Sequence, residues 1–207
     1  MASNLSRGLL PVVGALACGV AAAQTRLPTI PPEQYTAEQK RAAAEFFEAR
    51  KTPVFGPFEP LMHSPVLMSD ARAMGDYLRY QSAIGNRLSE FVILVVAREW
   101  TQDYEWSVHA PVARKQGIAP EIIDAIAEGR RPSGMSDDEE ICYEFSLELS
   151  RNRRVSDKTF ARAQKRFGEK GVVDLVGLNG YYSLLAMTLN TARTPAPDGY
   201  RLPRFPD

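Results

Sequence analysis

Apolar positions along most of the chain recur every three or four residues, which is the spacing of an amphipathic α-helix. Serine or proline near each start and glycine or proline near each end divide the pattern into separate helices. The pattern predicts eight of them, over residues 32–51, 64–85, 89–101, 104–116, 120–128, 136–153, 156–167 and 170–193. The proline and glycine residues between 53 and 60 predict a loop.

Residues 89–101 are apolar on almost every face, so we expect this helix to be the most buried. Periodicity alone also permits a short buried strand over residues 91–96. Because the sequence has no other strand candidate to pair with it, we interpret the segment as a helix. The predicted fold class is therefore all-α, with about eight helices in one domain.

The first 23 residues have a basic start, a short apolar run and three alanines before Gln24, which is typical of a secretory signal peptide. The apolar run of residues 9–23 is shorter than the roughly 20 residues of a spanning helix, so no stable membrane insertion is expected. We predict cleavage near Ala23 and an exported, periplasmic or secreted protein. Lipoprotein attachment through Cys18 is the less favoured alternative.

The rest of the chain divides into three parts. Residues 24–39 predict an extended lead-in and the start of the first helix, and residues 40–193 the helical domain. Residues 194–207 contain four prolines, so this tail should lie extended over another surface.

Composition excludes several classes of function. The sequence has 25 basic and 25 acidic residues, so it offers no strong field for nucleic acid or an anionic membrane surface. Its two cysteines cannot build a disulfide scaffold, and its two histidines leave little for a histidine-rich metal site.

The candidate chemistry is concentrated in residues 90–109. Glu105 and His109 are four residues apart and share a helix face, where a carboxylate would raise the pKa of the imidazole. Glu90 lies near the start of the preceding helix, and antiparallel packing of the two helices would bring it toward this pair. An ordinary surface ion pair is the alternative interpretation, but the apolar surroundings of Trp106 favour a cleft. We expect no metal ion here.

Residues 90–127, together with residues 180–190, resemble the carboxymuconolactone decarboxylase family, which shares its all-helical fold with alkylhydroperoxidase D. In the alkylhydroperoxidase branch the resemblance implies a Glu at Glu90, a CxxC pair at Gln102 and Glu105, and a His at His109. Both cysteine positions are therefore substituted. Cys142 lies outside the motif and is interpreted as an inert core residue.

The resemblance to the decarboxylase branch implies a cofactor-free lyase or isomerase that acts by proton transfer on a small carboxylated or lactone substrate. His109 would be the proton donor, Glu105 its orienting partner and Glu90 a second carboxylate. Trp106, Trp100 and Gln102 are the candidate substrate-binding residues, although core packing is an equally good explanation for either tryptophan.

Two alternatives remain open, namely peroxidase activity and a non-catalytic ligand-binding or scaffold role. The family also implies a homo-oligomer, a trimer or a hexamer. Arg151, Arg153 and Arg154 form a cationic cluster, which we interpret as solvated at a helix C-terminus.

Overall fold

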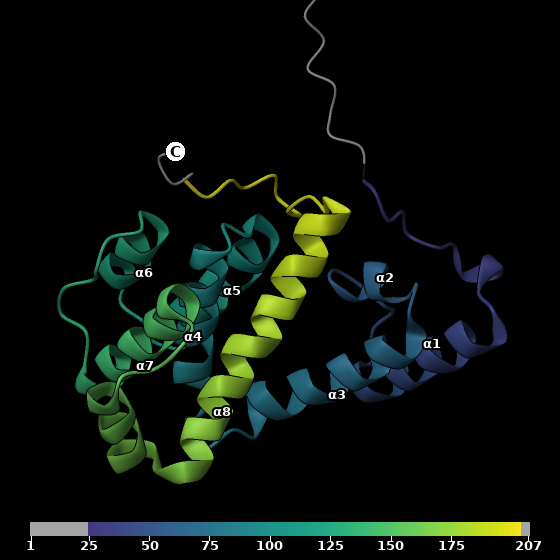
Figure 1. The fold of residues 1–207 in the computed structure, drawn as a ribbon. Coiled ribbons are helices and arrows are strands. Elements are labelled where there is room, and N and C mark those ends of the chain that lie inside the picture. The colour runs from purple at the N-terminus through teal and green to yellow at the C-terminus, as the bar shows by residue number, and fades with distance from the viewer. Residues whose placement is uncertain (1–24, 204–207) are drawn as a thin grey trace, which may run out of the picture.

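The computed structural model describes residues 25–203, and its regular structure is entirely helical. Figure 1 shows the helices gathered around α4, with α1 and α3 extending to one side. The all-α prediction is confirmed. The eight α-helices of the described chain are α1 (Ala37–Arg50), α2 (Phe58–Leu61), α3 (Pro65–Tyr80), α4 (Asn86–Glu99), α5 (Asp103–Lys115), α6 (Pro120–Ala127), α7 (Asp137–Leu147) and α8 (Asp157–Ala192).

The first helix begins later than its composition predicts. Residues Pro32–Gln34 form a short 3-10 helix, η1, and Tyr35 is extended. Thr36 then caps α1, because its side chain accepts a hydrogen bond from the backbone of Gln39, whose side chain bonds back to Thr36. This capping box satisfies free N–H groups at the true start of the helix, five residues after Pro32.

The predicted loop over residues 53–60 contains a helical turn. Helix α2 begins at Phe58, which is 2% exposed, and ends at Leu61, which is also buried. Phe58 packs edge-on against Phe46 of α1 at a ring separation of 5.0 Å. A four-residue element is too short to show helical periodicity, so the proline and glycine signals hid it.

Two other breaks involve residues 136–193. Ser136 and Glu139 form the predicted capping box of α7, but this α-helix ends at Leu147. The chain continues as one π-helical turn, η2 (Glu148–Asn152), and Arg153 then adopts left-handed geometry at φ 60°. Helix α8 is interrupted at Gly168, where φ is 69° and ψ is 178°. The interruption reproduces the predicted boundary between two helices, and glycine permits it at low steric cost.

Helix α4 forms the centre of the core. It packs against α5, α7 and α8 and also contacts α3 and α6, which explains why it is apolar all round. Every residue from Phe91 to Ala97 is at most 2% exposed, as the sequence predicts for its most buried helix.

Both ends of the described chain lie against the helices. Near the start, the N–H of Arg26 bonds to the carbonyl of Ala192 at 2.8 Å. The C-terminal segment crosses the start of α5, where the backbone of Leu202 and the side chain of Arg201 each bind Asp103 at 2.8 Å (Figure 1). The predicted signal peptide lies outside the described residues.

Among the described residues, α8 alone has the length and apolar composition to cross a membrane. However, 56% of its most apolar window is buried inside the protein, as in the core helix of a globular domain.

Gly75 permits the close approach of α3 and α8. A methyl group added there would lie 2.3 Å from the hydroxyl of Tyr181, whose ring is only 2% exposed and cannot easily move. We predict that Gly75→Ala lowers the free energy of unfolding by about 1–3 kcal/mol. Gly180→Ala is the matched control, because nothing lies within 4 Å of its added carbon, and it should be neutral or slightly stabilising. Urea denaturation of both variants measures the difference, and equal stabilities would contradict the close-packing argument.

Candidate functional site

A short link between α4 and α5 makes the two helices antiparallel. Thr101 adopts φ 45°, and the N–H of Gln102 bonds back to the carbonyl of Ala97 at 2.8 Å. The Gln102 side chain then caps α5 by accepting from the N–H of Tyr104 at 2.6 Å. This reversal brings the second turn of α4 beside the second turn of α5.

Glu90 and His109 consequently meet inside the protein. Nδ1 of His109 lies 2.6 Å from Oε2 of Glu90, and both residues are 4% exposed. The carboxylate accepts the Nδ1–H, which fixes the plane of the imidazole ring. Tyr182 of α8 packs edge-on against the ring, with centroids 5.3 Å apart.

Glu105 lies on the other side of the imidazole ring. Its Oε2 is 3.4 Å from Nε2 of His109, longer than an ordinary hydrogen bond, whereas its Oε1 is buried and has no hydrogen-bond partner. The closer contact of His109 is therefore with Glu90, although sequence spacing suggests Glu105 as its orienting partner. A buried carboxylate oxygen without a hydrogen-bond donor lowers the stability of the fold by about 1–3 kcal/mol, so the unpartnered Oε1 requires an explanation.

Arg79 completes the cluster from α3. Its Nη2 donates to Oε1 of Glu90 at 3.0 Å, and the guanidinium side chain is 21% exposed. Together, Arg79, Glu90, His109 and Glu105 form what we call the buried quartet, in which cationic and anionic groups alternate. With His109 protonated, the four charges sum to zero. The desolvation penalty of each buried charge is therefore offset only when its partners are also present.

The charges of the quartet shift one another's pKa values. Burial by itself would lower the pKa of His109, but the neighbouring Glu105 and Glu90 carboxylates outweigh burial and raise it. Burial would raise the pKa of Glu90, but its bonds to His109 and Arg79 lower it. The imidazolium form of His109 is therefore more favoured than in a free histidine, as a proton donor requires.

The geometry of the quartet does not suit a metal ion. The two carboxylates approach opposite nitrogens of one imidazole ring, so they cannot converge with it on a single ion. Across the described residues, no group of three or more histidine, cysteine, aspartate or glutamate side chains has the arrangement of a metal site.

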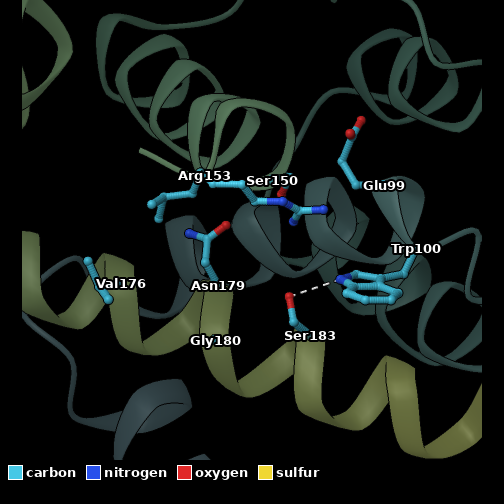
Figure 2. Close-up of a pocket in the computed structure, with 9 residues that line it drawn as sticks. Glu99, Trp100, Ser150, Arg153, Val176, Asn179, Gly180 and Ser183 are labelled. Atoms are coloured by element: carbon cyan, nitrogen blue, oxygen red, sulfur yellow. Dashed lines mark hydrogen bonds between the residues drawn. The ribbon is translucent and has the colours of Figure 1, made fainter. Parts of the chain in front are cut away.

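The three candidate substrate-binding side chains make other contacts than with the His109 ring. Trp106 is 4% exposed and belongs to the hydrophobic core. The side chain of Gln102 caps α5 and donates to Asn190 at 2.8 Å. The Trp100 indole bonds to Ser183 at 2.9 Å and lines a separate pocket, shown in Figure 2. The polar atoms of Trp100 and Gln102 are thus bonded to residues of α8 and to the start of α5 rather than to the His109 ring.

Cys142 is fully buried in the core, and it is the one free cysteine of the described chain. Burial raises its pKa, so the reactive thiolate form is disfavoured. The residue is therefore an unsuitable nucleophile.

A cavity of about 500 Å³ adjoins the quartet through Arg79. Its other charged residues are Arg50 and Asp76, which form an ion pair at 2.9 Å. Arg79 is bonded to Glu90, but its Nε has no hydrogen-bond partner, so the guanidinium retains a donor.

Sequence reasoning missed Arg79 and the contact made by Tyr182. Arg79 lies one position after the buried Leu78 on α3, but no local spacing links it to Glu90, eleven residues later. Tyr182 falls within the 180–190 segment that carries the family resemblance, yet its contact with His109 depends on how α8 packs.

No protein-family model matches the chain, and no curated protein matches it in sequence. Several solved structures do resemble it, including two peroxidase-related proteins. One is an alkylhydroperoxidase AhpD core structure, an uncharacterized peroxidase-related protein from Ralstonia eutropha JMP134. It matches with a TM-score of 0.67 at 16% sequence identity, and the match covers 86% of this chain and 95% of that chain. The other is an uncharacterized peroxidase-related protein from Silicibacter sp. TM1040, with a TM-score of 0.63 at 13% identity, over 88% and 97% of the two chains. This similarity establishes an AhpD-like fold, which confirms the fold implied by the sequence resemblance.

The quartet predicts a pH-dependent stability. The pKa of His109 is raised on folding. Its contribution to the free energy of unfolding is therefore complete below the pKa of the unfolded state, about 6.5, and is lost as pH rises through the pKa of the folded state. The free energy of unfolding should therefore fall on the alkaline side more steeply in the wild type than in His109→Gln.

Glu90 makes the stability depend on pH in the opposite direction. Because its pKa is lowered on folding, its contribution to the free energy of unfolding is lost as pH falls through the pKa of the folded state. Chemical denaturation between pH 4 and pH 9 measures both limbs. His63→Gln is the control for the alkaline limb, since His63 is exposed. A slope that survives in His109→Gln would exclude His109 as its source.

Proposed function

We propose that this protein is a cofactor-free acid/base enzyme of the carboxymuconolactone decarboxylase type, a lyase or isomerase acting on a small carboxylated or lactone substrate. The observation that carries the proposal is His109, a buried imidazole whose two nitrogens face Glu90 and Glu105. The AhpD-like fold supports it, and the resemblance of residues 90–127 to that family supplies the reaction class.

The two nitrogens of His109 have different freedom. Nδ1 is held by a short bond to Glu90, whereas Nε2 is 3.4 Å from Glu105 and is only loosely engaged. Nε2–H is therefore the transferable proton. The unpartnered Oε1 of Glu105 would accept a hydrogen bond from a hydroxyl or water in the substrate complex, which explains why it lacks a partner here.

The cavity at Arg79 supplies a place for the substrate carboxylate. Its guanidinium groups, Arg50 and Arg79, can donate hydrogen bonds to a carboxylate, and Arg79 also bonds to Glu90. In the proposed reaction the bond between the carboxyl carbon and the ring breaks, and CO2 leaves. The electron pair moves through the adjacent C=C into a dienolate, and the far carbon takes the Nε2 proton of His109. Solvent then returns a proton to the imidazole, so one proton is consumed for each CO2 released.

The peroxidase alternative has weaker support. The two solved structures are described as peroxidase-related, but Gln102 and Glu105 occupy the positions that the family resemblance gives to the CxxC pair. Cys142, buried in the core, offers no replacement thiol.

A non-catalytic, ligand-binding role is the second candidate function. The burial of His109, Glu90 and Glu105 favours it, because a closed and charge-balanced cluster can also serve only to stabilise the fold. Turnover measurements separate the two functions.

We predict that the purified protein converts γ-carboxymuconolactone or a related unsaturated lactone acid, and that His109→Ala lowers kcat by about 10²–10⁴-fold through loss of the proton donor. The wild-type kcat should fall as pH rises through the raised pKa of His109. Substrate absorbance and CO2 release measure turnover, and Cys142→Ser is the control that should retain it. Unchanged turnover in folded His109→Ala would remove the assigned role.

We also propose that the chain is exported through residues 1–23 and that it forms a trimer or hexamer. Helix α8 supports self-association because Val173, Val176 and Met187 are between 44% and 67% exposed on it. Light scattering should give the mass of an oligomer at micromolar concentration, and Val173→Asp should shift it toward the monomer. A wild-type chain that stays monomeric would contradict this proposal.

A further inference from the structure

A second pocket lies at the opposite end of α4 from the quartet. It has a volume of about 340 Å³ and is bounded by the end of α4, the π-helical turn η2 and the middle of α8 (Figure 2). Glu99, which lines it, is nine residues beyond Glu90, or about 13 Å along the helix axis. No quartet residue lines this pocket, so its chemistry is independent of His109.

Asn179 places an unsatisfied acceptor in the pocket. The residue is 5% exposed, and its Nδ2 donates to the carbonyl of Leu175 at 2.8 Å and to Ser146 at 3.1 Å. A carbonyl can only accept, so the contact with Leu175 fixes the orientation of the amide. Oδ1 is buried without a partner, and Figure 2 shows it on the side of Arg153 and Ser183. A ligand N–H or O–H would satisfy it.

Arg153 supplies an uncommitted cation. In Figure 2 its side chain extends across the pocket toward Trp100, with the guanidinium between Glu99 and Ser183. Glu99 does not neutralise it, because Arg151 occupies both carboxylate oxygens of Glu99 at 2.9 and 2.7 Å. Arg153 is exposed, as expected, and it also lines the pocket, where it follows the π-helical turn in left-handed geometry. Such π turns are frequent at functional sites.

Trp100 gives the pocket a fixed aromatic wall. Its Nε1 donates to Ser183 at 2.9 Å, which fixes the orientation of the indole. The hydroxyl hydrogen of Ser183 stays available to a ligand, because Ser183 acts as the acceptor in this bond. Leu149 and Val176 add apolar surface. The combination of an aromatic face, a cation and a buried acceptor is typical of sites for small polar ligands.

We infer that this pocket binds a small aromatic or unsaturated carboxylate that carries a hydroxyl or amino group. The carboxylate pairs with Arg153, the hydroxyl or amino hydrogen bonds to Oδ1 of Asn179, and the planar body lies against Trp100. The pocket is thus a second ligand site, separate from the proposed acid/base centre.

Calorimetric titration of the full chain with 3- and 4-hydroxybenzoate tests the ligand class. At least one of the two should bind more tightly than benzoate, which lacks the donor, and more tightly than its own methyl ester, which lacks the charge. Arg153→Gln should weaken the better ligand by about tenfold or more, since it removes a charge-assisted contact. Arg154→Gln is the matched control, because Arg154 is also exposed but does not line the pocket, and it should bind like the wild type.

Two further variants locate the site. Trp100→Phe should abolish the ligand-induced change in tryptophan fluorescence, whereas His109→Ala should leave binding unchanged, so failure of the proposed enzymatic function does not affect this result. Absence of binding by both hydroxybenzoates, or binding that is indifferent to Arg153→Gln, would overturn the inference. It would also be overturned if light scattering showed that Arg153→Gln dissociates an oligomer, because the pocket would then be an interface between copies.

Discussion

The structure depends on the burial of a charged residue at the start of its most apolar helix. Glu90 lies on α4, the helix that contacts most of the core, and it is 4% exposed. An isolated buried carboxylate is costly, and removing one partner of a buried ion pair costs about 3–5 kcal/mol. Arg79 from α3 and His109 from α5 neutralise Glu90, so one carboxylate determines how three helices pack.

The same neutralisation prepares His109 for proton transfer. Glu90 holds Nδ1, and the carboxylates on both sides raise the pKa of the ring, so the structural role of the cluster and its proposed chemistry have one electrostatic cause. Glu105 differs from the other members, because its free Oε1 is unnecessary for packing. That oxygen, rather than burial itself, is the strongest reason to assign a reaction to the cluster.

Helix α8 connects the two sites described above. Tyr182 faces His109, whereas the next residue, Ser183, anchors Trp100 at the second pocket. Successive residues on a helix are separated by about 100°, so one segment can contact two separate sites. Trp100 and His109, only nine residues apart in sequence, therefore belong to different sites.

Local physics made much of this protein predictable. Periodicity and capping residues predict most of the helices and the break at Gly168, and helical spacing pairs Glu105 with His109. The position of Glu90 followed from antiparallel packing of α4 on α5. The short helix α2, the π-helical turn and the cap at Thr36 were missed, because each depends on a few residues without a period. Only tertiary structure decided that Arg79 binds Glu90 and that Asn179 and Arg153 share a pocket with Trp100. Such contacts join separate helices, and their distances depend on packing directions that no local sequence pattern encodes.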